Sequence, residues 1–235
     1  MRATLAVMER ELRAYFLSPV GYVILFVFLF LSAIFFYIPL AAGEGSLRYF
    51  FSNVVIWLVI LVPAVTMRLI ADERRTGTIE VLMTSPVTDA QVILGKFLGS
   101  LGFYAVMLLL TLEFPLALRW ASTPDRGPII SGYLGLVLFG ASFLSIGLLA
   151  STLTRSQVVA FMTTVMTLLL LILIDWFASV STGSLNTVLQ FIGMRQHLEN
   201  FSKGIIDTKD VIYYLSVVGL CLILSTRALA AWKWR

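Results

Sequence analysis

Residues 14–43 read AYFLSPVGYVILFVFLFLSAIFFYIPLAAG, a stretch without a charged side chain that lies between Arg13 and Glu44. A helix that crosses the hydrocarbon core of a bilayer needs about 20 apolar residues, and a charge at its centre is costly. The apolar part of this stretch, about 20–42, is long enough to cross. It is too long for the apolar region of a cleavable signal peptide, which has about 7–15 residues, so we expect it to be retained.

The rest of the chain has the same character. Of its 235 residues 59% are hydrophobic and 13% are charged, with a mean hydropathy of +0.95. Soluble domains average about 45–50% apolar and about 25% charged residues, so this composition excludes a soluble fold. The net charge of +4 is not gathered into a basic stripe that could neutralise phosphates, and we expect no nucleic-acid partner.

Charged residues enclose five further apolar stretches. We therefore predict an all-α integral membrane protein that forms one domain over residues 1–235. Its six transmembrane helices are expected at about 20–42, 54–70, 97–118, 129–153, 158–180 and 211–231. Of the 17 Lys and Arg residues, eleven fall on the side of the N-terminus; the other six are Arg48, Arg119, Arg126, Arg195, Lys203 and Lys209. The positive-inside bias then predicts both termini in the cytoplasm.

Three segments outside the predicted spans have helical character. Residues 1–18 space apolar side chains by three and four, which predicts an amphipathic helix in the inner interface. Residues 71–95 form the longest cytoplasmic connection, with a short apolar helix at 78–83 and a capping box at Thr88 and Gln91 that begins the next helix. Residues 181–205 are too short and polar to cross, so a re-entrant or an interfacial segment on the outer side is expected.

The chain offers little chemistry of its own. It has no Gly-rich nucleotide-binding motif, and we expect no catalytic residue, no metal site and no bound cofactor. The single Cys221 cannot form an intrachain disulfide. His197 is the one histidine, and we predict an exposed loop residue there. Small residues in 129–153, and Gly95 with Gly99, predict close helix packing.

Two acids fall inside the predicted spans, where ionisable residues usually have a function. Glu113 and Asp175 lie at similar depth, near the outer edge of the hydrocarbon core. One interpretation places both at the outer interface, with Arg119 or a hydroxyl as partner. The alternative is an outer polar zone of a transport path between the third and fifth spans. A proton relay across the bilayer is disfavoured because no deeper ionisable group is available.

The connection after the second span carries a family resemblance. Residues 73–86, ERRTGTIEVLMTSP, followed by ILGK at 93–96, resemble the permease subunit of type 2 ABC exporters, and six spans with an N-terminal interfacial helix fit this resemblance over the whole chain. Within that superfamily, residues 18–23 and 204–210 are similar to the bacterial gliding-motility-associated branch. The family implies a multi-pass protein of the bacterial inner membrane.

The resemblance also implies partners and site residues. Two ABC ATPase subunits would bind ATP and Mg, a second permease copy would form a homodimer, and an accessory periplasmic or membrane subunit could join them. The helix at 78–83 would be the coupling helix, seated on the ATPase through Arg74, Arg75, Gly77, Thr78, Ile79, Glu80, Leu82, Met83, Ser85 and Pro86. Two alternatives stay open: a scaffold that transmits force in the envelope without moving a solute, and an ion-driven carrier, which would need a deep titratable site that the sequence lacks.

Overall fold

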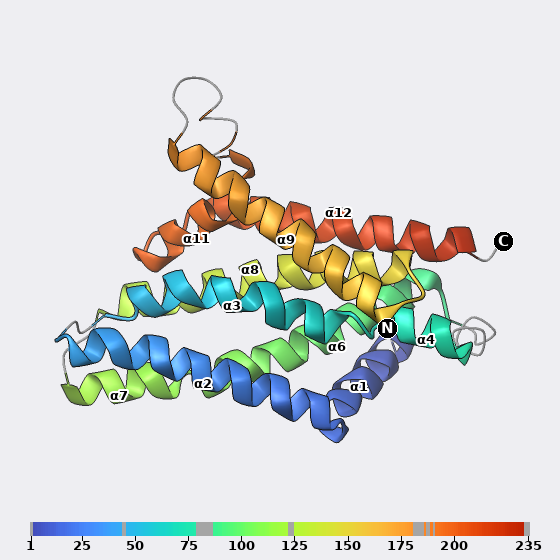
Figure 1. Ribbon diagram of the computed structural model, residues 1–235, viewed down its shortest axis with the longest axis horizontal. Coiled ribbons are helices and arrows are strands. Elements are labelled where there is room, and N and C mark those ends of the chain that lie inside the picture. Colours follow the sequence, from blue (N-terminus) through green and yellow to red (C-terminus); the bar gives the residue numbers. More distant parts are fainter. Residues whose placement is uncertain are drawn as a thin grey trace.

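The computed structural model describes residues 2–43, 46–78, 87–121, 125–180, 186, 189 and 191–232, and this part of the chain contains helices and no strands. Six helical segments are long and apolar enough to cross a membrane (Figure 1): Pro19–Ala41, Arg48–Thr76, Asp89–Trp120, Arg126–Leu153, Gln157–Ala178 and Thr208–Trp232. The predicted all-α fold and its six spans are therefore confirmed.

The N-terminal helix α1 (Arg2–Leu17) is separated from α2 (Pro19–Ala41) by Ser18 alone. Pro19 has no amide hydrogen and a fixed φ, which suits the first position of a helix but not its interior. The chain therefore bends at this point, and α1 leaves the direction of α2 (Figure 1). The hydroxyl of Tyr15 donates to the carbonyl of Val65 at 2.9 Å, which fixes α1 to the helix that follows α2.

The second and third spans are each built from two helices. The second comprises α3 (Arg48–Thr66) and the short α4 (Ala71–Thr76), and the third comprises α6 (Asp89–Leu110) and α7 (Glu113–Ala121). Pro115 explains the break between α6 and α7, because it cannot donate to the carbonyl of Thr111 four residues earlier. The hydroxyl of Tyr133 donates to that carbonyl instead, at 2.8 Å.

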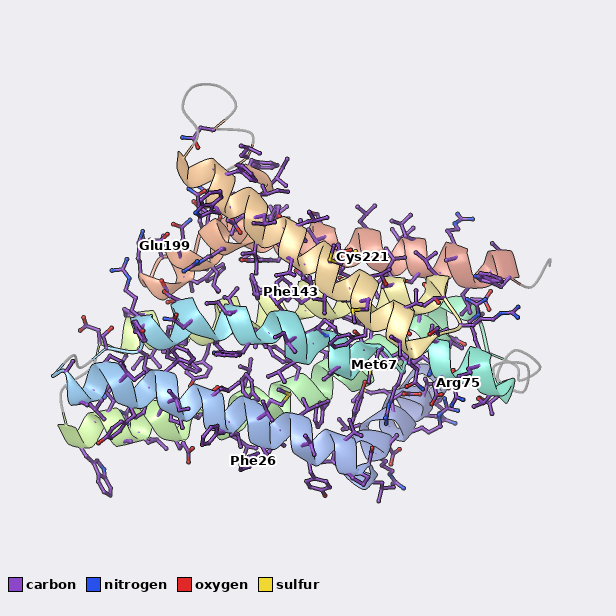
Figure 2. All side chains as sticks on the ribbon, viewed as in Figure 1. Phe26, Met67, Arg75, Phe143, Glu199 and Cys221 are labelled. Carbon is purple, nitrogen blue, oxygen red and sulfur yellow. The ribbon has the colours of Figure 1, made fainter. Side chains whose placement is uncertain are left out.

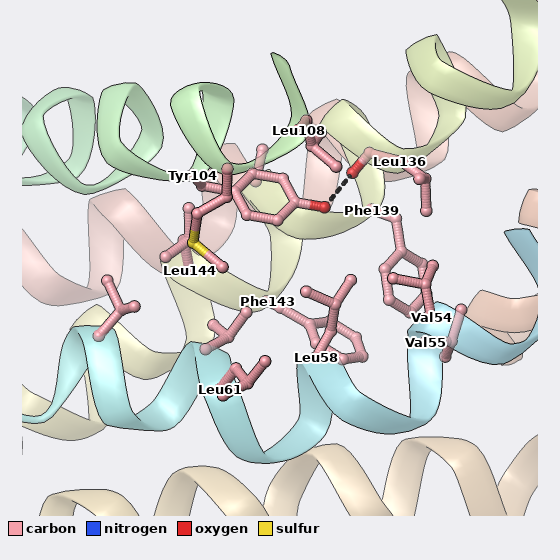
Figure 3. Packing of buried hydrophobic residues seen from close by; sticks show 14 of the residues in the cluster. Val54, Val55, Leu58, Leu61, Tyr104, Leu108, Leu136, Phe139, Phe143 and Leu144 are labelled. Carbon is pink, nitrogen blue, oxygen red and sulfur yellow. Dashed lines mark hydrogen bonds between the residues drawn. The ribbon is translucent and has the colours of Figure 1, made fainter. Parts of the chain in front are cut away.

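The core lies around α8 (Arg126–Leu153), which packs against α3, α6, α11 and α12. Aromatic rings of other helices rest directly on its glycines: Phe51 on Gly132 and Tyr104 on Gly140, so that a Cβ atom at either position would collide with the ring. The hydroxyl of Tyr104 donates to the carbonyl of Leu136 at 2.9 Å (Figure 3). The close packing predicted from the small residues of this span is thus confirmed.

The last three helices are α9 (Gln157–Val180), α11 (Met194–Ser202) and α12 (Thr208–Trp232). Few residues of α9 and α12 are fully buried, as expected for helices that face lipid. The short helix α11 belongs to the predicted outer segment 181–205. Residues 181–185, 187, 188 and 190 of that segment lie outside the described residues.

Candidate functional site

At one end of the bundle, α6 buries the ammonium group of Lys96, whose side chain is 1% exposed. Its Nζ atom lies 2.8 Å from Oε1 of Glu11 on α1 and 2.8 Å from Oε1 of Glu73 on α4. Arg10 Nη2 lies 3.0 Å from the same oxygen of Glu11 and 2.7 Å from that of Glu73. These four residues, called the charge network below, join α1, α4 and α6.

The charge network is electrically balanced. Two cations face two carboxylates, which compensates for the hydration that a buried ammonium group loses. Burial lowers the pKa of the Arg10 guanidinium, but the hydrogen bonds and charges of Glu11 and Glu73 outweigh that effect, so its pKa is raised above the ordinary value. The two carboxylates thus favour the charged form of Arg10.

Two glycines bring α1 close enough to α6 for these contacts. A Cβ atom at Gly95 would lie 2.7 Å from Cβ of Val7, and one at Gly99 would lie 2.7 Å from Cβ of Glu11. Both distances are too short for real side chains, so only glycine permits this approach. The predicted role of Gly95 and Gly99 in close packing is confirmed.

Arg74 connects α4 to the opposite side of the bundle. Its Nη1 atom donates to the carbonyls of Thr152 at 2.9 Å and Thr154 at 3.4 Å, and its guanidinium lies 3.6 Å from the ring centroid of Trp232 on α12. Ser151 on α8 accepts from the amides of Ile70 and Ala71 at 3.1 Å each, where α4 begins. The short helix α4 is thus held by α8 and α12 as well as by the charge network.

The next residues of the predicted coupling segment that the structure describes, Arg75, Gly77 and Thr78, are exposed, and Figure 2 labels Arg75. Arg75 is exposed and pairs with Asp72 at 3.0 Å. Gly77 ends α4 in the left-handed conformation, with φ of 76°, and Thr78 follows it. The capping box of Thr88 and Gln91 is confirmed. The other predicted contact residues lie outside the described residues: Ile79, Glu80, Leu82, Met83, Ser85 and Pro86.

A large cavity of about 960 Å³ lies at the other end, among α3, α9 and α11. Its walls are mostly apolar, and its charged lining residues are Arg48, Asp175, Arg195 and Glu199. Oδ2 of Asp175 accepts from the backbone amide of Arg195 at 3.1 Å, at the beginning of α11. A carboxylate at this position satisfies a free helix amide and the positive end of the helix dipole. Asp175 therefore both lines the large cavity and positions α11.

Glu113 lies elsewhere. It begins α7 and is exposed, on a helix that lies away from the end of α9 (Figure 1). No interaction between Glu113 and Asp175 is found in the part of the chain that the structure describes. The structure therefore does not bring the two predicted acids together.

The prediction for His197 is wrong. The residue is 8% exposed, its Nδ1 atom lies 2.6 Å from Oδ1 of Asp210, and its ring stacks on that of Tyr213 at a centroid distance of 4.2 Å. Asn200 donates to the other oxygen of Asp210 at 2.8 Å. Asp210, at the beginning of α12, has no access to solvent, and a buried carboxyl group needs hydrogen-bond partners. His197 and Asn200 are these partners, which explains why the histidine is buried.

Sequence reasoning did not identify the charge network. The available signal was Lys96, a cation between two glycines that mark a packing face, since residues three apart lie on the same side of a helix. That signal shows that Lys96 is buried against another helix. It does not identify Glu11 and Glu73 as the partners.

Comparisons with known proteins identify a family. The family described as "ABC-2 family transporter protein" matches residues 37–195 of the chain. A segment of 101 residues is 33% identical to the "Probable multidrug ABC transporter permease YbhR" of Escherichia coli strain K12, and equally to that of Escherichia coli O157:H7. This segment covers 43% of the chain and 27% of the length of each relative.

Proposed function

The chain belongs to the ABC-2 family of transporter proteins, and from this premise we propose that it forms the transmembrane path of an exporter driven by a separate ATPase. These 235 residues contain no nucleotide-binding motif, so ATP and Mg²⁺ would be bound by the partner. The working unit in this proposal contains two copies of the chain and two of the ATPase.

The anchorage of α4 is the observation that supports coupling best. Glu73 joins this helix to α1 and α6 through the charge network, while the next residue, Arg74, joins it to α8 and α12. The predicted coupling segment follows α4 directly in the chain. A displacement of that segment by the ATPase would therefore reach four other helices through ion pairs and hydrogen bonds.

The coupling segment has the composition of a docking helix. Ile79, Leu82 and Met83 belong to a short apolar run that follows the charged residues 72–75. A short helix of this kind is marginally stable alone and is stabilised by a hydrophobic groove on a partner. We infer that the ATPase supplies this groove and that Arg75 and Glu80 contact its rim.

The large cavity is our candidate for a part of the transport path. Its volume of about 960 Å³ is in the upper range of sites for drug-sized molecules. The apolar walls from α3 and α9, combined with charges of both signs, suit an amphiphilic substrate. In this assignment Asp175 belongs to the path and Glu113 does not.

The excess of Lys and Arg supports an orientation for the protein. We place the charge network and both termini on the cytoplasmic side of a bacterial inner membrane, and the large cavity toward the outer side. We also assign the chain to the gliding-motility-associated branch, on the sequences of residues 18–23 and 204–210. Loss of surface motility on deletion of the gene would test that assignment.

Co-purification with the ATPase tests the proposed function. An ABC ATPase is sought in the neighbouring reading frames and co-expressed with the chain, and the complex is isolated through a tag on the ATPase. Leu82→Asp should abolish co-purification, because a charge replaces an apolar contact. Ile205→Asp is the matched control: this residue is exposed, 55%, and lies in the turn before α12. It should leave the complex intact.

The result also decides between transport and alternatives. If Leu82→Asp retains the ATPase and the ATP-dependent uptake of an amphiphilic dye into inverted vesicles, the coupling assignment is wrong. If the native complex forms and hydrolyses ATP but moves no amphiphile, the force-transmitting scaffold replaces the exporter.

A further inference from the structure

A second cavity, of about 380 Å³, lies beside the charge network. Its lining comes from α1, from the beginning of α2, from the end of α3 with the turn after it, and from α4 and α6. Tyr15 fixes the position of α1 against α3, and Gly21 brings α2 into contact with the carbonyl of Tyr15. The cavity is therefore a built feature at the junction of the interfacial helix with two spans.

The charges around this cavity are unequally satisfied. Arg10 and Lys96 are engaged by the carboxylates of the charge network. Arg68 also lines the cavity, and no ion pair to its guanidinium is found among the described residues. One lining cation is thus left for an anion from outside the chain.

Within the part of the chain that the structure describes, each of the three carboxylates that line the cavity has one oxygen without a hydrogen-bond or ion-pair partner. The interactions of the Glu11 and Glu73 side chains reach Oε1, and those of Asp72 reach Oδ1. An ionised carboxylate can accept about four hydrogen bonds through its two oxygens. The second oxygens of Glu11 and Asp72 can therefore accept hydrogen bonds from a cationic donor.

The remaining wall is apolar. It is formed by Val20, Ile24, Ala64 and Leu69. The first two belong to the beginning of a spanning helix, and α1 beside them is amphipathic. A ligand here would have its charged part against Arg68 and the carboxylates, and its apolar part along α2 and α3.

We propose that this cavity binds the headgroup of phosphatidylethanolamine from the surrounding bilayer. Arg68 binds the phosphate, because a guanidinium matches phosphate geometry and charge. The primary ammonium donates hydrogen bonds to the free oxygens of Glu11 and Asp72. Phosphatidylcholine cannot donate such bonds, and phosphatidylglycerol carries no cation. The acyl chains leave along the apolar wall.

Lipid retention tests this site on the full chain. The purified protein is placed in nanodiscs of phosphatidylcholine with equal parts of phosphatidylethanolamine and phosphatidylglycerol, returned to mild detergent, and analysed by native mass spectrometry. The native chain should retain phosphatidylethanolamine at least about tenfold over either other lipid. Arg68→Gln should lose this preference. Arg13→Gln, an exposed position on α1 outside both cavity linings, should keep it.

A second variant and a soluble probe complete the test. Ala64→Phe fills the cavity from α3 without removing a charge and should also abolish retention, while the melting temperature shows that each variant is folded. Equal retention of phosphatidylglycerol, or of phosphatidylcholine, would overturn the proposal. Displacement of the lipid by soluble phosphoethanolamine at comparable concentration would overturn the lipid as its source. These readouts do not depend on the ATPase or on transport.

Discussion

The two ends of the helix bundle use their charges differently. At the end formed by α1, α4 and the beginning of α6, buried ion pairs connect helices to one another. At the end formed by α3, α9 and α11, Arg48, Arg195 and Glu199 are exposed around a cavity of about 960 Å³. Glu199 is labelled in Figure 2. The first arrangement fixes helices relative to each other, and the second leaves space between them. A transporter driven from one end needs both.

Removal of Lys96 should have the largest effect on stability. Lys96→Met leaves Glu11 and Glu73 mostly buried, with the half-exposed Arg10 as their one remaining cation in the network. Breaking a buried pair in this way costs about 3–5 kcal/mol. The free energy of unfolding in detergent, measured by denaturant titration, reports the loss.

Lys203→Met provides the matched control for this change. Lys203 also pairs with a glutamate at 2.8 Å, but both partners are substantially exposed. Its removal should cost less than about 1 kcal/mol. Equal effects of the two substitutions would show that the two ends do not differ in the way that the geometry indicates.

The pair of His197 and Asp210 should give the next largest effect. This pair is buried, although Arg48, Arg195 and Glu199 at this end are exposed: Asp210 has no access to solvent and is hydrogen-bonded to His197 and Asn200. Asp210→Ala leaves both partners without that hydrogen bond and should cost about 2–3 kcal/mol. Thermal unfolding measures it.

Asp207→Ala is the control for Asp210→Ala. Asp207 lies in the preceding turn and pairs with the exposed Lys209. Oδ1 of Asp207 also accepts from the backbone amide of Lys209 at 3.1 Å and so caps the beginning of α12. Asp207→Ala should therefore lower the melting temperature slightly, by clearly less than Asp210→Ala does. A large shift for Asp207 and none for Asp210 would contradict the burial of the histidine pair.

The fold was predictable because each span is marked by its own residues. The charges around each apolar run are local signals, and the cost of charges in lipid makes them decisive. The contacts of the charge network and of the pair of His197 and Asp210 are not marked by neighbouring residues in the sequence. Glu11 and Lys96 are 85 residues apart, and their contact depends on how α1 crosses Gly95 and Gly99. The sequence around His197 gives no indication that Asp210 is buried beside it.

Arg74 and Arg75 are neighbours on α4 with different contacts. Arg74 anchors the helix to α8 and α12, whereas Arg75 pairs with Asp72 at the surface. Arg74→Ala removes two hydrogen bonds and the contact with Trp232, and should cost about 1–2 kcal/mol. It should also reduce the stimulation of ATPase activity by an amphiphilic substrate, because α4 is no longer held by α8 and α12. Arg75→Ala removes one exposed ion pair and should leave stability unchanged. Identical stimulation in Arg74→Ala and the native complex would contradict transmission through α4.

The smallest expected effect is the pH dependence of stability that comes from Glu199, beside the large cavity. The hydrogen bond from Lys203 is the largest cause that lowers the pKa of Glu199 below its ordinary value, and the charges of Arg48 and Arg195 act in the same direction. A lowered folded-state pKa means that the ion pair contributes its full stability above the unfolded pKa, near 4.5, and loses it as pH falls through the folded pKa. Because the carboxylate is half-exposed, solvent screening limits this to less than about 0.5 kcal/mol. The free energy of unfolding should therefore fall between neutral and acidic pH, and Lys203→Gln should make that fall slightly smaller. High salt should abolish this difference between the variant and the native chain. A larger difference that persists in salt would show that the charges around the large cavity are held as firmly as those of the charge network.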